Sequence, residues 1–179
     1  CFLSAVHHTS DYGIDCGEVD NEESVIFGYS SGSPSSTSFN GREVCNNNNG
    51  CVITSHSKLT HRRTGRSYEF IINCARAAIE HRLQSLLDRY TSRHLIFDES
   101  VSMHCPSGKH AQTTMSYVIN SVTTNSSLLE SAIVSKNFEE LLLDAVLRLP
   151  SNYWEQLHNL SAASVIPGTV TKAEAFMAG

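Results

Sequence analysis

The sequence has no long apolar run, no excess of positive charge and no initiating methionine. None of its hydrophobic stretches approaches the roughly 20 residues that a membrane-spanning helix needs, so we expect no membrane segment. The 179 residues carry 13 basic and 18 acidic side chains, a net charge of −5. Because an acidic surface is a poor match for phosphates, we do not expect these residues to bind nucleic acid themselves. The start on Cys1, without a Met or a leader, predicts a fragment or a processed product.

Two common metal-binding patterns are also missing. The cysteines, at 1, 16, 45, 51, 74 and 105, include no Cys-x-x-Cys pair, and we expect buried cytosolic thiols rather than a disulfide framework. There is no His-x-His pair, the arrangement with which cupin enzymes bind metal; His56 and His61 lie five positions apart. His104 and His110 flank Cys105 without a fourth ligand. We therefore expect no metal, no cofactor and no catalysis, with a cupin-like metal-dependent enzyme as the alternative.

The first part of the chain, up to about Cys74, has the pattern of short strands separated by turns. The predicted strands are 2–9, 25–30, 36–39, 42–44, 51–54, 59–64 and 68–74. Asn40 and Gly41 favour a two-residue hairpin, because both central residues of a type I′ turn need positive φ. Short strands at this spacing predict a sandwich or a small barrel.

After Cys74 the apolar residues recur with the period of a helix. A first helix would present Ala75, Ile79, Leu83, Leu86, Leu87 and Tyr90 on one face, and a second, after a loop through Pro106 and Gly108, would present Met115, Val118, Ile119 and Val122. A third helix is predicted from about Leu128 to Leu149, where Pro150 ends it. A short helix over 153–160 and another from about Val170 complete the prediction. The resulting division is 1–74 as barrel, 75–160 as helical region, and 161–179 as linker and the start of a further helix.

Six segments occur in a particular order along the chain: SFNGREV, GCVITSHSKLTHRRTG, YEFIINCARAAIEHRLQSLL, HLIFD, NFEELLLDAVLRLPSNY and VTKAEAFM. As a series they resemble the N-terminal effector-binding domain of AraC/XylS-type transcription regulators, in the XylS-like branch. In that family the last barrel strand runs straight into a helix with alternating Leu and Ala. HLIFD is similar to the segment before the family's helical region, and VTKAEAFM to the lead-in to its tandem helix-turn-helix domain. The run 46–49 and the Ser-rich region 30–37 depart from the family pattern.

The resemblance implies an α+β fold, a cupin-like β-barrel followed by an α-helical dimerisation region. It implies the ligand-sensing and dimerisation domain of a bacterial, cytoplasmic regulator that binds a small-molecule effector in the barrel and forms a homodimer. DNA would be contacted only through a C-terminal helix-turn-helix domain, absent from this chain, and no membrane would be involved.

A basic cluster lies between positions 56 and 66. Its members are Lys58, Arg62, Arg63 and Arg66, with His56 and His61 between them. A barrel that binds a carboxylate needs a cation to replace the hydration of the anion, and arginine does so through its bidentate fork. Only alternate residues of a strand point inward, so at most one of Arg62 and Arg63 could serve. His61, Arg62 and Arg63 are therefore candidate effector-binding residues, and a solvated hairpin is the alternative.

Three more candidates lie in the predicted strands 2–9 and 25–30. His7 and His8 must face opposite sides of their strand, and His7 is the candidate for the barrel interior, where an imidazole could hydrogen-bond a ligand. Phe27 and Tyr29 share a face and could line an apolar pocket that has one hydroxyl group. The alternatives are a core or rim histidine and ordinary core packing.

The long predicted helix from Leu128 has an apolar stripe that could cover the barrel and leave a seam for a partner. The candidate dimer-interface residues are Leu128, Ile133, Phe138, Leu141, Leu142 and Ala145. The alternative is that packing within the chain uses the whole stripe.

Overall fold

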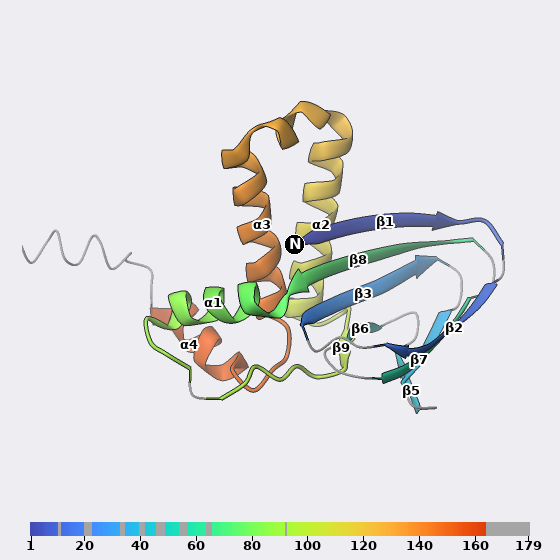
Figure 1. Cartoon of the computed structure of the whole chain (residues 1–179), viewed down its shortest axis with the longest axis horizontal. Coiled ribbons are helices and arrows are strands. Elements are labelled where there is room, and N and C mark those ends of the chain that lie inside the picture. The colour runs from blue at the N-terminus through green and yellow to red at the C-terminus, as the bar shows by residue number, and fades with distance from the viewer. Residues whose placement is uncertain are drawn as a thin grey trace, which may run out of the picture.

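The computed structural model describes residues 1–10, 12–19, 23–32, 35–39, 42–45, 49–53, 57–63, 66–91 and 93–163. The strands are β1 (Phe2–His8), β2 (Tyr12–Val19), β3 (Ser24–Gly32), β4 (Ser35–Phe39), β5 (Arg42–Cys45), β6 (Asn49–Ile53), β7 (Ser57–Arg63), β8 (Ser67–Ala75) and β9 (Ser100–Ser102). The helices are α1 (Arg76–Leu87), α2 (Pro106–Thr124), the 3₁₀ helix η1 (Ser126–Glu130), α3 (Ala132–Leu147) and α4 (Trp154–Ala163). The molecule is thus a mixed α+β structure, with the strands first and the helices after them (Figure 1).

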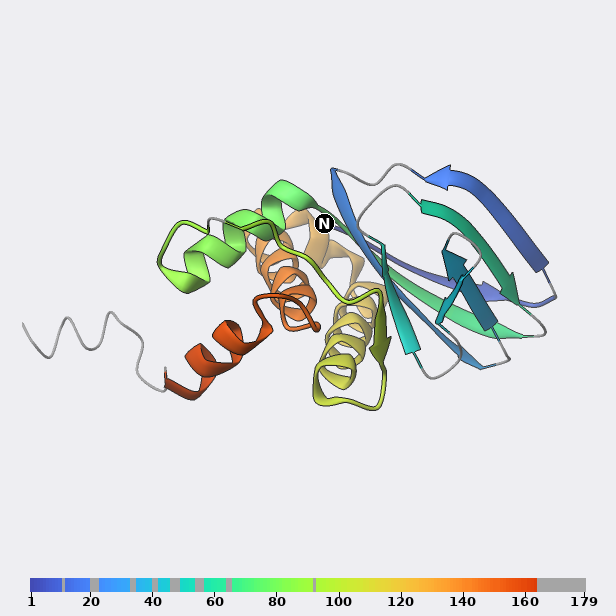
Figure 2. The same ribbon diagram turned by 90° about the horizontal axis from the view of Figure 1, so that it is seen from below.

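The strands form two antiparallel sheets that face each other (Figure 2). One has the order β1-β8-β3-β6-β9 and the other the order β2-β7-β4-β5. Apart from the hairpin β4–β5, consecutive strands from β1 to β8 lie in different sheets, an arrangement typical of a jelly roll. The two facing sheets agree with the predicted sandwich, and the cupin-like barrel stays a prediction.

Each of the predicted strands corresponds to a strand of the structure. Phe39 pairs with Arg42 across β4 and β5, as the hairpin prediction requires; residues 40 and 41 themselves lie outside the described residues. The structure has two further strands, β2 and β9, that the sequence pattern does not predict; β2, which contains two glycines, pairs along β7 from Tyr12 to Val19. Pairing with β7 stabilises β2 in an extended conformation, although the composition of β2 does not favour a strand.

The apolar core lies between the five-stranded sheet and the helices, with the second sheet on the far side (Figure 2). Val25 pairs with Cys74 and Phe27 with Ile72, so these side chains share one face of the sheet. All four are at most 1% exposed, and they pack in one cluster with helical residues such as Ile79 and Met115. The helices therefore cover the outer face of the five-stranded sheet.

The helices differ from the predictions in their boundaries. In α1 the predicted face is buried only at Ile79 and Leu83, whereas Leu86 is exposed and Tyr90 lies beyond the helix, also exposed. Helix α2 begins at Pro106, which the sequence pattern had placed in a loop, and Gly108 lies in its first turn. A Cβ on Gly108 would collide with the backbone of Ser102 and come within 3.0 Å of the Met103 Cα, so glycine allows α2 to approach β9 closely.

The predicted third helix is divided in two. Ser131 separates η1 from α3 and caps α3, its hydroxyl accepting a hydrogen bond from the Val134 amide at 3.4 Å. As a result α2 and α3 form a hairpin that stands beside the start of β1 (Figure 1). Helix α4 begins at Trp154, close to the predicted short helix. The helix predicted from about Val170 lies outside the described residues.

Two of the segments that carry the family resemblance lie against each other. The Asn152 side chain accepts a hydrogen bond from the Ile96 amide at 3.0 Å and donates one to the His94 carbonyl at 2.9 Å. The Asp98 amide donates to the Pro150 carbonyl at 3.0 Å. These bonds fix the HLIFD segment to the chain between α3 and α4.

A disulfide joins Cys1 to Cys74, with Cα atoms 4.3 Å apart. The expectation of free thiols is therefore wrong for this pair. Antiparallel pairing of β1 with β8 brings the two ends together, a long-range effect that cysteine spacing does not reveal. Cys51 and Cys105 are not disulfide-bonded. Among the described residues, no helix combines the length and apolar character needed to cross a membrane.

Candidate functional site

In the predicted basic cluster, Arg66 is exposed, and Lys58, His61, Arg62 and Arg63 are described only in their backbone. His61, Arg62 and Arg63 lie in β7, where they pair with Ile14, Gly13 and Tyr12 of β2. Their side chains and residue His56 lie outside the described residues, so the predicted ligand contacts of this cluster remain predictions. Strands β6 and β7 belong to different sheets, so they do not form a hairpin.

His7 lies at the surface rather than in the barrel interior. It pairs with Tyr68 across β1 and β8, and the two rings stack with centroids 4.5 Å apart. Tyr68 is 50% exposed, and His7 is exposed as well. The stack therefore covers an edge of the sheet, which corresponds to the rim alternative.

Phe27 and Tyr29 share a face of β3, as expected, but that face is turned toward the helices. The Phe27 ring is fully buried, and the Tyr29 ring stacks on Phe70 with centroids 4.9 Å apart. Burial raises the pKa of the Tyr29 phenol above its usual 10.0, and the Ser116 and Gln112 side chains of α2 partly offset this shift. The pair thus belongs to the core between sheet and helices, not to the space between the two sheets.

The opposite face of the five-stranded sheet looks toward the second sheet and is less closely packed. Its residues on β3 and β8 are half-buried, among them Ile26, Glu69, Ile71 and Asn73. Polar and apolar groups alternate there, and solvent reaches them. This face is the part of the barrel interior that a ligand could contact.

A cavity lies outside the barrel, in the angle between β1 and the α2–α3 hairpin. We call it the β1–hairpin groove; its volume is about 800 Å³, within the range of small-molecule sites. Strand β1 provides Phe2, Leu3 and Ala5; the helices provide Val118, Ile119, Val122, Leu129, Phe138 and Leu142. Phe2 is 64% exposed and Leu129 53% exposed, so apolar surface beside the groove faces water.

Two charged side chains of α3 lie in this mostly apolar lining, which also includes Thr123 and Ser135. Lys136 and Glu139 both line the groove, and the amino group of Cys1 lies 2.8 Å from the Glu139 carboxylate. Glu139 thus has a cationic partner, while Lys136 is available for an anionic or polar group of a ligand. The sequence pattern identified the apolar face of α2 correctly, but it did not indicate that β1 lies next to it.

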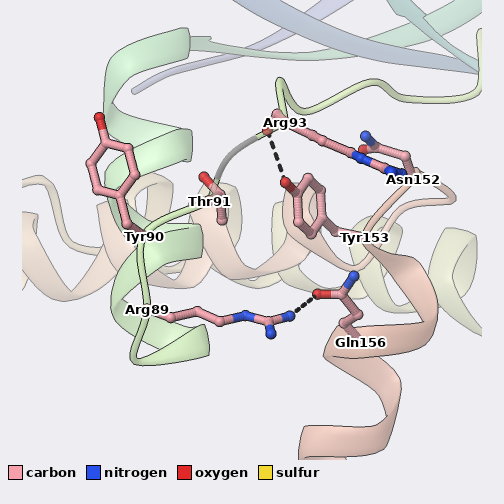
Figure 3. Close-up of a pocket in the computed structure, with 7 residues that line it drawn as sticks. All are labelled: Arg89, Tyr90, Thr91, Arg93, Asn152, Tyr153 and Gln156. Carbon is pink, nitrogen blue, oxygen red and sulfur yellow. Dashed lines mark hydrogen bonds between the residues drawn. The ribbon is translucent and has the colours of Figure 1, made fainter.

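A smaller, polar pocket of about 220 Å³ lies between the segment after α1 and the start of α4 (Figure 3). The Tyr153 hydroxyl donates a hydrogen bond to the Arg93 carbonyl at 2.8 Å, and the Arg89 guanidinium donates to the Gln156 side chain. These polar groups are satisfied within the chain. These two hydrogen bonds attach α4 and the residue before it to the segment that follows α1.

The predicted dimer-interface residues separate into two groups. Phe138, Leu142 and Ala145 are buried in the chain's own core, so the intramolecular alternative holds for them, and Leu128 is partly buried against the same core. Ile133 and Leu141 are 75% and 43% exposed. Leu141 and Leu142 are neighbours in the same turn, so the division follows the sides of α3 rather than its length.

Within the ranges that the structure describes, no group of three or more His, Cys, Asp or Glu side chains is arranged to hold a metal ion.

Comparison with solved structures finds a distant structural likeness. No protein-family model matches the chain, and no curated protein matches its sequence. Among solved structures, it is similar to the crystal structure of unsaturated fatty acid bound wild-type ToxT from Vibrio cholerae strain SCE256, with a TM-score of 0.43 and 7% identity. The match covers 79% of this chain and 50% of that one, so the chain spans about half the length of the protein it matches.

Proposed function

We propose that the chain is the ligand-sensing and dimerisation domain of a bacterial AraC/XylS-like transcription regulator, without catalytic activity. The order of its parts supports this proposal: jelly-roll strands come first, a helical hairpin follows, and the HLIFD segment joins the two, as the family resemblance implies. In this proposal the regulator is cytoplasmic, and a helix-turn-helix domain after Gly179 binds the DNA.

The effector would be a small apolar molecule with one anionic or polar group. The observation that carries this assignment is the β1–hairpin groove, which is mostly apolar along both walls and includes Lys136 in its lining. Because β1 belongs to the sheet and α2 and α3 to the helical part, a ligand there would contact both. It could then favour one arrangement of the two parts, to the extent that it binds that arrangement more tightly.

The dimer contact would use the exposed face of α3 that includes Ile133 and Leu141. These residues are eight positions apart, so they lie on one side of the helix, whereas Lys136, Glu139 and Leu142 face the groove on another side. Dimerisation and effector binding could therefore occur together on the same helix.

Binding of decanoate, measured by calorimetry and by thermal shift, tests the effector site. We expect saturable binding and a rise in melting temperature of about 5 °C when the ligand is at a hundred times its Kd. Ile119→Trp, which places a large ring in the groove, should weaken binding at least about tenfold. Ile96→Trp, the same change at an exposed site away from the groove, should not. If decanoate does not bind, or binds equally well to Ile119→Trp, the groove is not the effector site.

A further inference from the structure

A second cavity, of about 570 Å³, lies where the ends of three helices meet. We call it the helix-end cavity. His110 comes from the first turns of α2, Arg148 follows the last turn of α3, and Trp154, Leu157 and His158 come from α4. It shares no lining residue with the β1–hairpin groove.

The lining of the helix-end cavity is positively charged. It includes Arg148, His110 and His158 and no Asp or Glu. Asp144 also acts on His110, but its carboxylate accepts two hydrogen bonds from the Arg82 guanidinium, at 2.8 and 2.9 Å. Within the described ranges, no hydrogen bond or ion pair engages the Arg148 guanidinium, whose fork is therefore available to an anion.

One wall of the cavity is a flat aromatic surface. The rings of Trp154 and His158 stack with centroids 4.8 Å apart and an interplanar angle of 12°. Leu157 and Pro150 extend the apolar lining. Trp154 is 40% exposed, an unusual degree of exposure for an indole beside a cavity, and a second flat ring could cover it.

We propose that the helix-end cavity binds an aromatic monoanion, such as an aromatic carboxylate, with its ring against Trp154 and its anionic group on Arg148. A single full charge matches the single arginine, and the His110 imidazole can donate one further hydrogen bond. Burial and the neighbouring Arg148 lower the pKa of His110 below its usual 6.5, so at neutral pH this histidine contributes a hydrogen bond rather than a second charge.

Binding at this cavity would fix the position of α4. The ligand would contact the start of α2, the end of α3 and the body of α4 at the same time. Helix α4 is also the last described element before residues 164–179. A ligand in the helix-end cavity would therefore stabilise the position from which the rest of the chain continues.

Quenching of tryptophan emission tests the proposal on the chain as it stands. Trp154 is the only tryptophan, so its emission reports on this cavity. The probe is 4-nitrobenzoate, a nitroaromatic quencher, with 4-nitrobenzyl alcohol as its uncharged counterpart and calorimetry as a second measure of binding. We expect saturable quenching by the carboxylate and an affinity at least about tenfold lower for the alcohol.

Variants of Arg148 separate this site from non-specific association. Arg148→Gln should weaken 4-nitrobenzoate binding about tenfold or more, and Arg148→Lys should weaken it less because it keeps the charge. Arg66→Gln, the same change at an exposed arginine beside β8, should have no effect. Equal affinity of Arg148→Gln and the original chain would overturn the proposal. So would equal affinity for the alcohol, or neither saturable quenching nor heat of binding at millimolar probe.

Discussion

Arg82 of α1 and Asp144 of α3 form a bidentate ion pair, with Nε to Oδ1 at 2.8 Å and Nη2 to Oδ2 at 2.9 Å. Glu140 lies farther from the same guanidinium, at 3.9 Å. The hydrogen bonds that Arg82 donates to Asp144 are the main reason that the pKa of Arg82 is raised. Because α1 follows the last barrel strand directly, this pair attaches the helical hairpin to the end of the barrel.

Loss of this ion pair should destabilise the fold. Both side chains are partly shielded, with 25% and 32% of their surface exposed, so Arg82→Ala should lower the free energy of unfolding by about 1–2 kcal/mol. Urea unfolding measures the change. In a double-mutant cycle with Asp144→Ala, the two losses should be less than additive; fully additive losses would show that the pair contributes nothing.

The disulfide between Cys1 and Cys74 should stabilise the chain mainly by restricting its unfolded state. The two cysteines are 73 positions apart, and closing a loop of that length is worth about 2–4 kcal/mol. Thermal unfolding with and without dithiothreitol should show the difference. Cys1→Ser should unfold at the temperature of the reduced chain and should not respond to the reductant. An equal melting temperature in all three samples would contradict this account.

Tyr29 should make stability depend on alkaline pH. Burial raises the pKa of its phenol in the folded chain, so above pH 10 the unfolded chain releases this proton while the folded chain still holds it. The contribution to stability is therefore complete below about pH 10 and declines as the pH rises further. Urea unfolding at pH 8 and pH 10.5 tests this, with Tyr29→Phe as the reference. The decline should be smaller in the variant, and equal declines would show that Tyr29 ionises freely in the folded state.

Seven of the nine strand positions could be predicted from local patterns, but their surroundings could not. Alternation shows that Phe27 and Tyr29 share a face, and the structure confirms that they do. Which layer covers that face depends on the pairing of β3 with β8 and on the docking of α2, contacts between residues far apart in sequence. Both candidate cavities arise in the same way, since each joins elements that no local period connects.

The helical region gives a second example, at Ser131, of a feature that the local sequence pattern does not predict. The apolar stripe from Leu128 is continuous enough to predict one long helix, and only a single capping serine marks the break. The structure places Phe138 of α3 in the core and leaves Ile133 of the same helix exposed.

The exposed face of α3 should mediate self-association. Ile133→Glu and Leu141→Glu each place a charge on a surface that, in the proposed dimer, excludes water, so each should raise the dimer dissociation constant about tenfold or more. Because both side chains face solvent within a single chain, the melting temperature of the variants extrapolated to low concentration should match that of the original.

Sedimentation velocity over a range of concentrations measures the effect, and Ile96→Glu, at an exposed isoleucine outside α3, is the matched control. A chain that stays monomeric at high micromolar concentration, or one whose association Ile96→Glu disrupts equally, would remove α3 as the dimer contact. The effector test at the β1–hairpin groove would be unaffected by that outcome, since the groove lies on another side of the same helix.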